Sequence, residues 1–132
     1  MKFSIVLCLL FAVSICAACN SSSAETQTSV IKQISVEQAK KETEKENIQF
    51  IDVRTEAEYL SGHAPGTINL PLDSLEQNLS KLDKSKPVYV ICQTGRRSQK
   101  GAEMLEKKGF KDLYNIEGGT SAWEKAGLPI EK

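Results

Sequence analysis

Residues 87–105 read "PVYVICQTGRRSQKGAEML", and this stretch decides the fold. The apolar run 88–92 has the length and composition of a buried strand, and it ends on Cys92. A helix is expected from about Ser98 to Lys108, ending at Gly109, a residue type that readily adopts the left-handed conformation of helix ends. A strand that passes through a short loop into a helix is the repeating unit of α/β proteins.

The rest of the chain repeats this alternation. Ser35 with Gln38, and Thr55 with Glu58, have the capping-box spacing that opens a helix. Further strands are predicted at 30–35, 48–53, 67–70 and 112–116. Further helices are predicted at 35–46, 73–82 and 121–126, together with a short helix that begins at Thr55, and a turn is predicted at 117–120. We therefore predict one α/β domain over residues 30–132, in three layers, with a central, mostly parallel five-stranded sheet flanked by helices.

The composition gives no support to nucleic acid as a partner. The 132 residues contain 17 Lys and Arg against 17 Asp and Glu, so overall charge gives no reason to expect nucleic acid. The chain is 40% hydrophobic and 26% charged, as in an ordinary globular domain.

The first eighteen residues predict a signal peptide. Met1 and Lys2 precede thirteen uncharged residues, and small residues follow. A permanent membrane span needs about 20 apolar residues, so export is the better interpretation of this shorter run. We expect the mature protein in the cell envelope, on the periplasmic or extracytoplasmic face.

The segment "CAAC" at 16–19 resembles the lipobox of bacterial lipoproteins, in which a cysteine is lipidated and becomes the mature N-terminus. Cys19 would carry the lipid, although Cys16 stands where that pattern usually has leucine. Cleavage by the ordinary signal peptidase, leaving Cys19 as a free thiol, is the alternative. Residues 19–29 are polar and small, which is typical of a flexible tether, so contact with a membrane is expected only through the lipid.

Cys92 is then the thiol that remains free in the exported domain, where cysteines normally occur in pairs. Gly95 permits a tight turn that brings backbone N–H groups inward, and the start of the next helix adds its positive end. Arg96 and Arg97 add formal positive charge. All three features favour a thiolate and can lower a cysteine pKa from about 8.5 into the range of about 3.5–7.5.

Each of these residues also has a structural explanation. A cysteine at the end of a strand is often inert packing, and two arginines at a helix start often form a solvated face. Their coincidence within six residues, between a strand and a helix, favours a reactive thiol in an anion-binding loop.

Three motifs resemble the rhodanese-like sulfurtransferase family over about residues 30–128. They are "FIDVRTEAEYLSGHAPGTINLPL" at 50–72, "VYVICQTGRRS" at 88–98 and "GGTSAW" at 118–123. The resemblance implies that Cys92 takes a sulfane sulfur from a donor such as thiosulfate and holds it as a persulfide. A thiophilic acceptor, such as cyanide, a thiol or a protein, then removes that sulfur.

The same resemblance implies roles for the neighbouring residues. The cradle for the transferred sulfur would be formed by Gln93, Thr94, Gly95, Arg96 and Arg97. Asp52 and Arg54 are expected to form a structural pair that braces the site, and His63 to brace its loop and not to act as a base. No cofactor is expected. A single histidine is also a poor basis for zinc, so no metal is expected.

Two alternatives remain open at this stage. Cysteine phosphatases and arsenate reductases place arginine after Cys and five residues, but here that position is Ser98 and Arg97 comes one residue early. The other alternative is a non-enzymatic sulfur carrier or sulfide-sensing module that docks on a partner protein.

Overall fold

The computed structural model describes residues 30–132, so the predictions for the signal peptide, the tether and Cys19 lie outside the described residues. The strands are β1 (Ile31–Ile34), β2 (Gln49–Asp52), β3 (Ile68–Asn69), β4 (Val88–Ile91) and β5 (Leu113–Ile116). The helices are α1 (Val36–Thr43), α2 (Glu56–Ser61), α3 (Arg96–Lys107) and α4 (Gly119–Lys125), with 3₁₀ helices η1 (Leu72–Ser74) and η2 (Glu76–Lys81). None of the helices in this part of the chain has the length and apolarity to cross a membrane.

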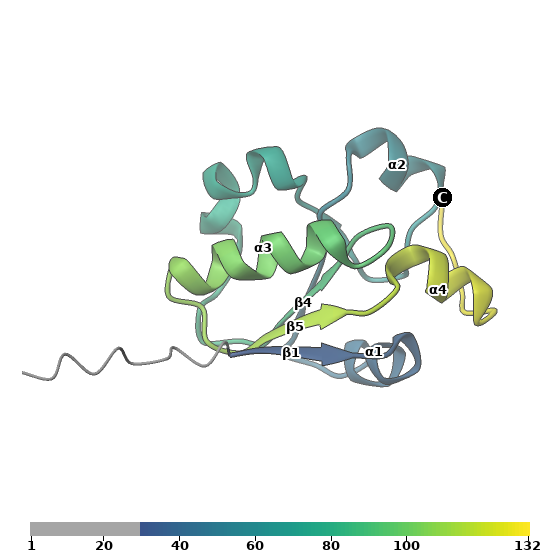
Figure 1. Cartoon of the computed structure of the whole chain (residues 1–132), viewed down its shortest axis with the longest axis horizontal. Helices are drawn as coiled ribbons and strands as arrows, with labels where there is room; N and C mark the ends of the chain where they lie inside the picture. The colour runs from purple at the N-terminus through teal and green to yellow at the C-terminus, as the bar shows by residue number, and fades with distance from the viewer. Residues whose placement is uncertain (1–29) are drawn as a thin grey trace, which may run out of the picture.

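The five strands form one sheet in the order β1-β5-β4-β2-β3, and every pair is parallel. Figure 1 shows α1 and α4 on one side of the sheet and α3 with the η1–η2 segment on the other. The predicted α/β fold and its five-stranded sheet are confirmed.

Side-chain alternation along β4 explains the three layers. Val88 and Val90 contribute to the core beneath α3, whereas Tyr89 and Ile91 contribute to the core beneath α1 and α4. All four residues are buried, because successive side chains of a strand point to opposite faces and both faces are covered. Trp123 of α4 is fully buried in the second core.

The helical segment predicted at 73–82 is confirmed, and it consists of two 3₁₀ helices. This region forms η1 and η2, whose hydrogen bonds join residues three apart, as from Ser74 N–H to the Pro71 carbonyl at 3.0 Å. The side chains of Ser74 and Asn78 also donate to backbone carbonyls here, which competes with regular α-helical bonding.

Two helices begin earlier than predicted, and both starts bear on the site. Helix α3 begins at Arg96 and not at Ser98, because the Gly95 carbonyl accepts the first intrahelical bond from Gln99 N–H at 3.3 Å. Helix α4 begins at Gly119, inside the predicted turn at 117–120. Helix α1 ends at Thr43 instead of Glu46.

Candidate active site

The carboxyl ends of β2, β4 and β5 lie at one edge of the sheet and bring together segments far apart in the chain. Cys92 directly follows β4, Arg54 follows β2, and Gly118 follows β5. Figure 1 shows the loop between β4 and α3 at this edge, next to the start of α4. This edge is where parallel α/β sheets place their binding sites.

The Cys92 sulfur is surrounded by hydrogen-bond donors from its own loop. Gly95 N–H donates to Sγ at 3.1 Å, and the Ser98 hydroxyl lies 3.2 Å from Sγ. Cys92 is 1% exposed, so the sulfur lies at the floor of the loop. Among the described residues it is the free cysteine.

These contacts shift the pKa of the thiol. Burial raises the pKa of Cys92, but the hydrogen bonds from the Ser98 hydroxyl and from the N–H groups of Ser98, Thr94 and Gly95 outweigh burial. The net effect is a pKa below the ordinary value of a cysteine. The loop therefore stabilises a thiolate, mainly through backbone amides and one hydroxyl.

The N-terminus of α4 turns the loop carbonyls away from the sulfur. Thr120 N–H donates to the Cys92 carbonyl at 2.8 Å, and Ser121 N–H donates to the Gln93 carbonyl at 3.1 Å. The approach is so close that a Cβ at residue 119 would lie 2.7 Å from the Gln93 carbonyl carbon. With their carbonyls held outward, the peptide units of the loop can present their N–H groups inward.

Arg54 joins three segments below the loop. It is 2% exposed and pairs with Asp52, Nη2 to Oδ2 at 2.8 Å. It also donates to the Gly62 carbonyl at 2.7 Å and to Gln93 Oε1 at 3.2 Å. The structure thus places Asp52 and Arg54 as a buried pair in contact with the loop and not with the sulfur.

His63 lies on the connection after α2. Its ring stacks on Tyr59 with centroids 3.7 Å apart, and its Nδ1 is 2.9 Å from the Tyr59 carbonyl. Its backbone pairs with Glu131 in both directions at 2.9 Å. These contacts are those of a residue that holds the connection in place. No group of three or more potential metal-ligating side chains occurs within residues 30–132.

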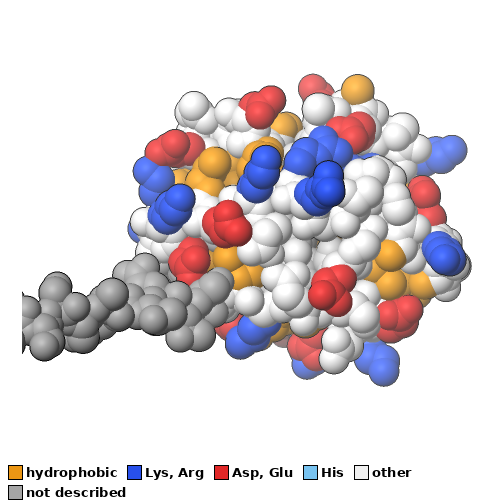
Figure 2. Space-filling view, viewed as in Figure 1, with side chains coloured by type: hydrophobic (Ala, Val, Ile, Leu, Met, Phe, Trp, Pro, Cys, Tyr) orange, Lys and Arg blue, Asp and Glu red, His pale blue; other side chains and the backbone are white. Residues whose placement is uncertain are grey.

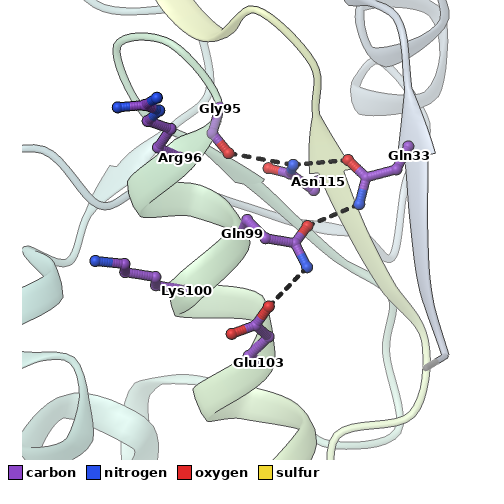
Figure 3. Close-up of a pocket in the computed structure, with 7 residues that line it drawn as sticks. All are labelled: Gln33, Gly95, Arg96, Gln99, Lys100, Glu103 and Asn115. Atoms are coloured by element: carbon purple, nitrogen blue, oxygen red, sulfur yellow. Dashed lines mark hydrogen bonds between the residues drawn. The ribbon is translucent and has the colours of Figure 1, made fainter.

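The two loop arginines differ in their surroundings. Arg97 donates to both carboxylate oxygens of Glu58, at 2.8 and 2.7 Å. This bond is the largest cause that raises the pKa of Arg97, and the negative charge of the Cys92 thiolate raises it further. Arg96 projects outward beside Lys100 in Figure 3, and Figure 2 shows basic side chains gathered over the start of α3. Arg97 is therefore partly neutralised, and Arg96 carries its charge at the surface near the loop.

Comparison with known proteins places these features in a family. The rhodanese-like domain family profile matches residues 35–126. A thiosulfate sulfurtransferase GlpE from Shewanella oneidensis is 36% identical over 98 residues, which are 74% of this chain and 97% of that protein. The chain belongs to the rhodanese-like domain family.

Further relatives agree with this assignment. A crystal structure of a rhodanese-like domain protein from Staphylococcus aureus is 36% identical, with a TM-score of 0.67, and the match covers 76% of this chain and 99% of that one. A putative sulfur carrier protein, YrkF from Bacillus subtilis, is 35% identical over 96 residues, which are 72% of this chain and 52% of that protein.

Several groups that this rhodanese-like domain places around Cys92 are not predicted from the sequence. The sequence indicates Ser98 only as the start of a helix and as the position that lacks the phosphatase arginine, yet its hydroxyl contacts the sulfur. The sequence could have indicated this contact, because Ser98 lies six residues after Cys92, in the first turn of a helix. Thr120 and Ser121 gave no such signal, because their contact with the loop arises only when α4 docks against it.

Proposed function

We propose that this rhodanese-like protein is a sulfurtransferase that carries sulfur as a persulfide on Cys92. The observation that carries the proposal is the Cys92 sulfur at the floor of its loop, with Gly95 N–H at 3.1 Å and the Ser98 hydroxyl at 3.2 Å. Such donors favour a thiolate, which is the nucleophilic form of cysteine.

The reaction proceeds in two displacements. The Cys92 thiolate attacks the outer sulfur of a donor such as thiosulfate, forming a sulfur–sulfur bond on the protein. The original sulfur–sulfur bond of thiosulfate breaks, and sulfite leaves with the electron pair. An acceptor such as cyanide or a thiolate then attacks the outer sulfur of the persulfide, and Cys92 is released as the thiolate.

The loop supports both displacements. The N–H groups of Thr94, Gly95 and Ser98 stabilise negative charge on the sulfur, and the Gln93 side chain is held by Arg54 and Ser121. Arg96 is exposed beside the loop, and its charge attracts an anionic donor, whereas Arg97 contributes less because it pairs with Glu58.

Thiosulfate:cyanide transfer by the wild type and by Cys92→Ser tests the proposal. We expect turnover with ping-pong kinetics in the wild type. In the variant, turnover should fall at least about a thousandfold, because the nucleophilic Cys92 sulfur is gone. Intact mass after thiosulfate treatment should show the gain of one sulfur atom in the wild type only. Equal turnover by both proteins would reject the proposal.

A sulfur-carrier role is the second candidate. It is favoured by the similarity to the putative sulfur carrier protein YrkF and by the 1% exposure of Cys92, which limits access to the loaded sulfur. A carrier would gain one sulfur atom on treatment with thiosulfate yet show no measurable turnover with cyanide or small thiols. It would discharge only to a partner protein.

We further propose that the domain works in the cell envelope, exported by the segment 1–18 and held at a membrane by lipid on Cys19. Expressed with its signal segment in a bacterium, the wild type should partition into detergent, and Cys19→Ala should partition into water. Equal partitioning of the two proteins would contradict lipidation.

A further inference from the structure

Asn115 of β5 is a buried amide next to the active-site loop. It is 4% exposed, and its Nδ2 donates to two acceptors, Gln33 Oε1 at 2.7 Å and the Gly95 carbonyl at 3.3 Å. Figure 3 shows this amide between Gly95 and Gln33. Its position in the parallel register, opposite Val90 of β4 and Gln33 of β1, places it where the sheet meets the loop.

The orientation of this amide is determined by its two acceptors. Among the buried side-chain oxygen and nitrogen atoms of the described residues, Asn115 Oδ1 alone has no hydrogen-bond partner. An unpaired buried acceptor costs about 1–3 kcal/mol. Rotating the amide by half a turn would direct Oδ1 at two other acceptors and lose both existing bonds. The Asn115 side chain is therefore held with its donor on the Gly95 carbonyl.

Gly95 is held at both ends by these contacts. Its N–H donates to Cys92 Sγ at 3.1 Å, and its carbonyl accepts from Asn115 and from the N–H of Gln99. Its φ of 95° lies in the left-handed region, where a glycine has no Cβ to restrict it. The N–H and the carbonyl of Gly95 belong to two successive peptide units, and glycine leaves the rotations between them free, so external bonds must fix both units.

The hydrogen bonds continue from Asn115 away from the loop. Gln33 Nε2 donates to Gln99 Oε1 at 2.7 Å, and Gln99 Nε2 donates to Glu103 Oε1 at 3.0 Å. Figure 3 shows these side chains as a chain of amides that runs from Gly95 across β5 and β1 to α3. Arg96 and Lys100 extend away from it in the same view. Asn115 is thus anchored from β1 and α3 while it holds the loop.

We infer that Asn115 is a positioning residue: by fixing the Gly95 carbonyl, it keeps the Gly95 N–H directed at Cys92 Sγ. The expected effect of Asn115 on turnover rests on the proposed function, whereas its expected effect on the pKa of the Cys92 thiol does not. Asn115 does not contact the sulfur, and it acts through Gly95.

Asn115→Leu tests this role, because leucine has a similar size and removes both the donor and the unpaired acceptor. We expect the midpoint of the pH profile for alkylation of Cys92 by iodoacetamide to move to higher pH by about one unit, with turnover about three- to tenfold lower at about pH 7. The charged residues at the loop are Arg54 with Asp52, Arg97 with Glu58, Arg96, and Glu117, whose backbone lies next to Gly95. Glu103 ends the chain of amides that begins at Asn115, and the variant leaves all of these residues in place.

Tyr114→Phe is the matched control on the same strand, since Tyr114 stacks on Tyr89, on the opposite face of β5 from Asn115. It should leave the midpoint unchanged. Gln33→Met, on the edge strand β1, provides a second test if Asn115→Leu does not fold, and it should shift the midpoint in the same direction by a smaller amount.

A folded Asn115→Leu with the wild-type midpoint would overturn the inference, as would an unshifted Gln33→Met. A shifted midpoint in Asn115→Leu, together with a wild type that transfers no sulfur, would reject the proposed function and leave the positioning role standing.

Discussion

At the scale of the residue, the central feature is a sulfur whose burial and hydrogen bonding act in opposite directions. Burial raises the pKa of Cys92, and the donors of Ser98, Thr94 and Gly95 lower it by more. The N–H donors of Ser98, Thr94 and Gly95 are fixed by the backbone and need no reorganisation when the sulfur gains charge. The guanidinium group of Arg97, by contrast, is shared with Glu58.

Ser98→Ala is predicted to raise the pKa of Cys92, because the hydroxyl hydrogen bond favours the thiolate. A hydrogen bond to a charged group contributes about 1.5–3 kcal/mol, so the alkylation midpoint should rise by about one to two units. Ser121→Ala is the matched control, since its hydroxyl accepts from Gln93 Nε2 and does not contact the sulfur. A midpoint that Ser98→Ala does not move would contradict this role of the hydroxyl.

Cys92 and the course of its loop could be predicted from the sequence, because a strand, a cysteine, a glycine and a helix follow one another within a few residues. The direction of each side chain could not. Arg97 bonds Glu58, 39 residues away, and the sequence indicated Glu58 only as a capping residue.

At the scale of the element, α4 and the loop depend on each other. The first N–H groups of α4 bond the Cys92 and Gln93 carbonyls, so a helix start that would otherwise need a capping side chain is satisfied by the loop. The contact requires glycine at 119, where φ is 57° and the loop backbone lies against the Cα.

Gly119→Ala should therefore both destabilise the protein and raise the alkylation midpoint of Cys92. The left-handed conformation costs alanine about 1–2 kcal/mol, and the clash with Gln93 adds about 1–3 kcal/mol. Gly127→Ala is the matched control, because Gly127 also has positive φ, at 70°, but a Cβ added there would meet no atom within 4 Å. Equal losses in unfolding free energy for the two variants would show that the clash is absent.

Glu58 and Arg97 join helix α2 to α3, and this pair makes the free energy of unfolding depend on pH in the acid range. The hydrogen bond from Arg97 is the main cause that lowers the pKa of Glu58 to about 2, from 4.5. A carboxylate with a lowered folded-state pKa stabilises the protein fully above its unfolded pKa, and this stabilisation is lost as the pH falls toward the folded value.

Glu58→Gln retains atoms for the capping hydrogen bonds and removes the charge. The two side chains are 35% and 36% exposed, so solvent limits the pair to about 1 kcal/mol. Chemical denaturation should show the wild type about 1 kcal/mol more stable than Glu58→Gln at about pH 7, with the difference shrinking between pH 4.5 and about 2. A difference that stays constant down to about pH 2 would exclude this ion pair as its source.

At the scale of the whole molecule, the parallel sheet explains why distant motifs meet. Strands β2, β4 and β5 end at one edge, and each continues directly into a segment that contacts the Cys92 loop. The alternation of strands and helices was sufficient to predict this arrangement. The helical segment at 72–81 could be predicted but its 3₁₀ type could not, because its apolar spacing also suits an α-helix.

The pH dependence of Cys92 alkylation in the wild-type protein tests the central claim most directly. A thiolate stabilised by inward-facing N–H groups predicts a midpoint clearly below the value of about 8.5 of a free cysteine, with rapid reaction at neutral pH. A midpoint at or above that value, with slow reaction at neutral pH, would contradict the account.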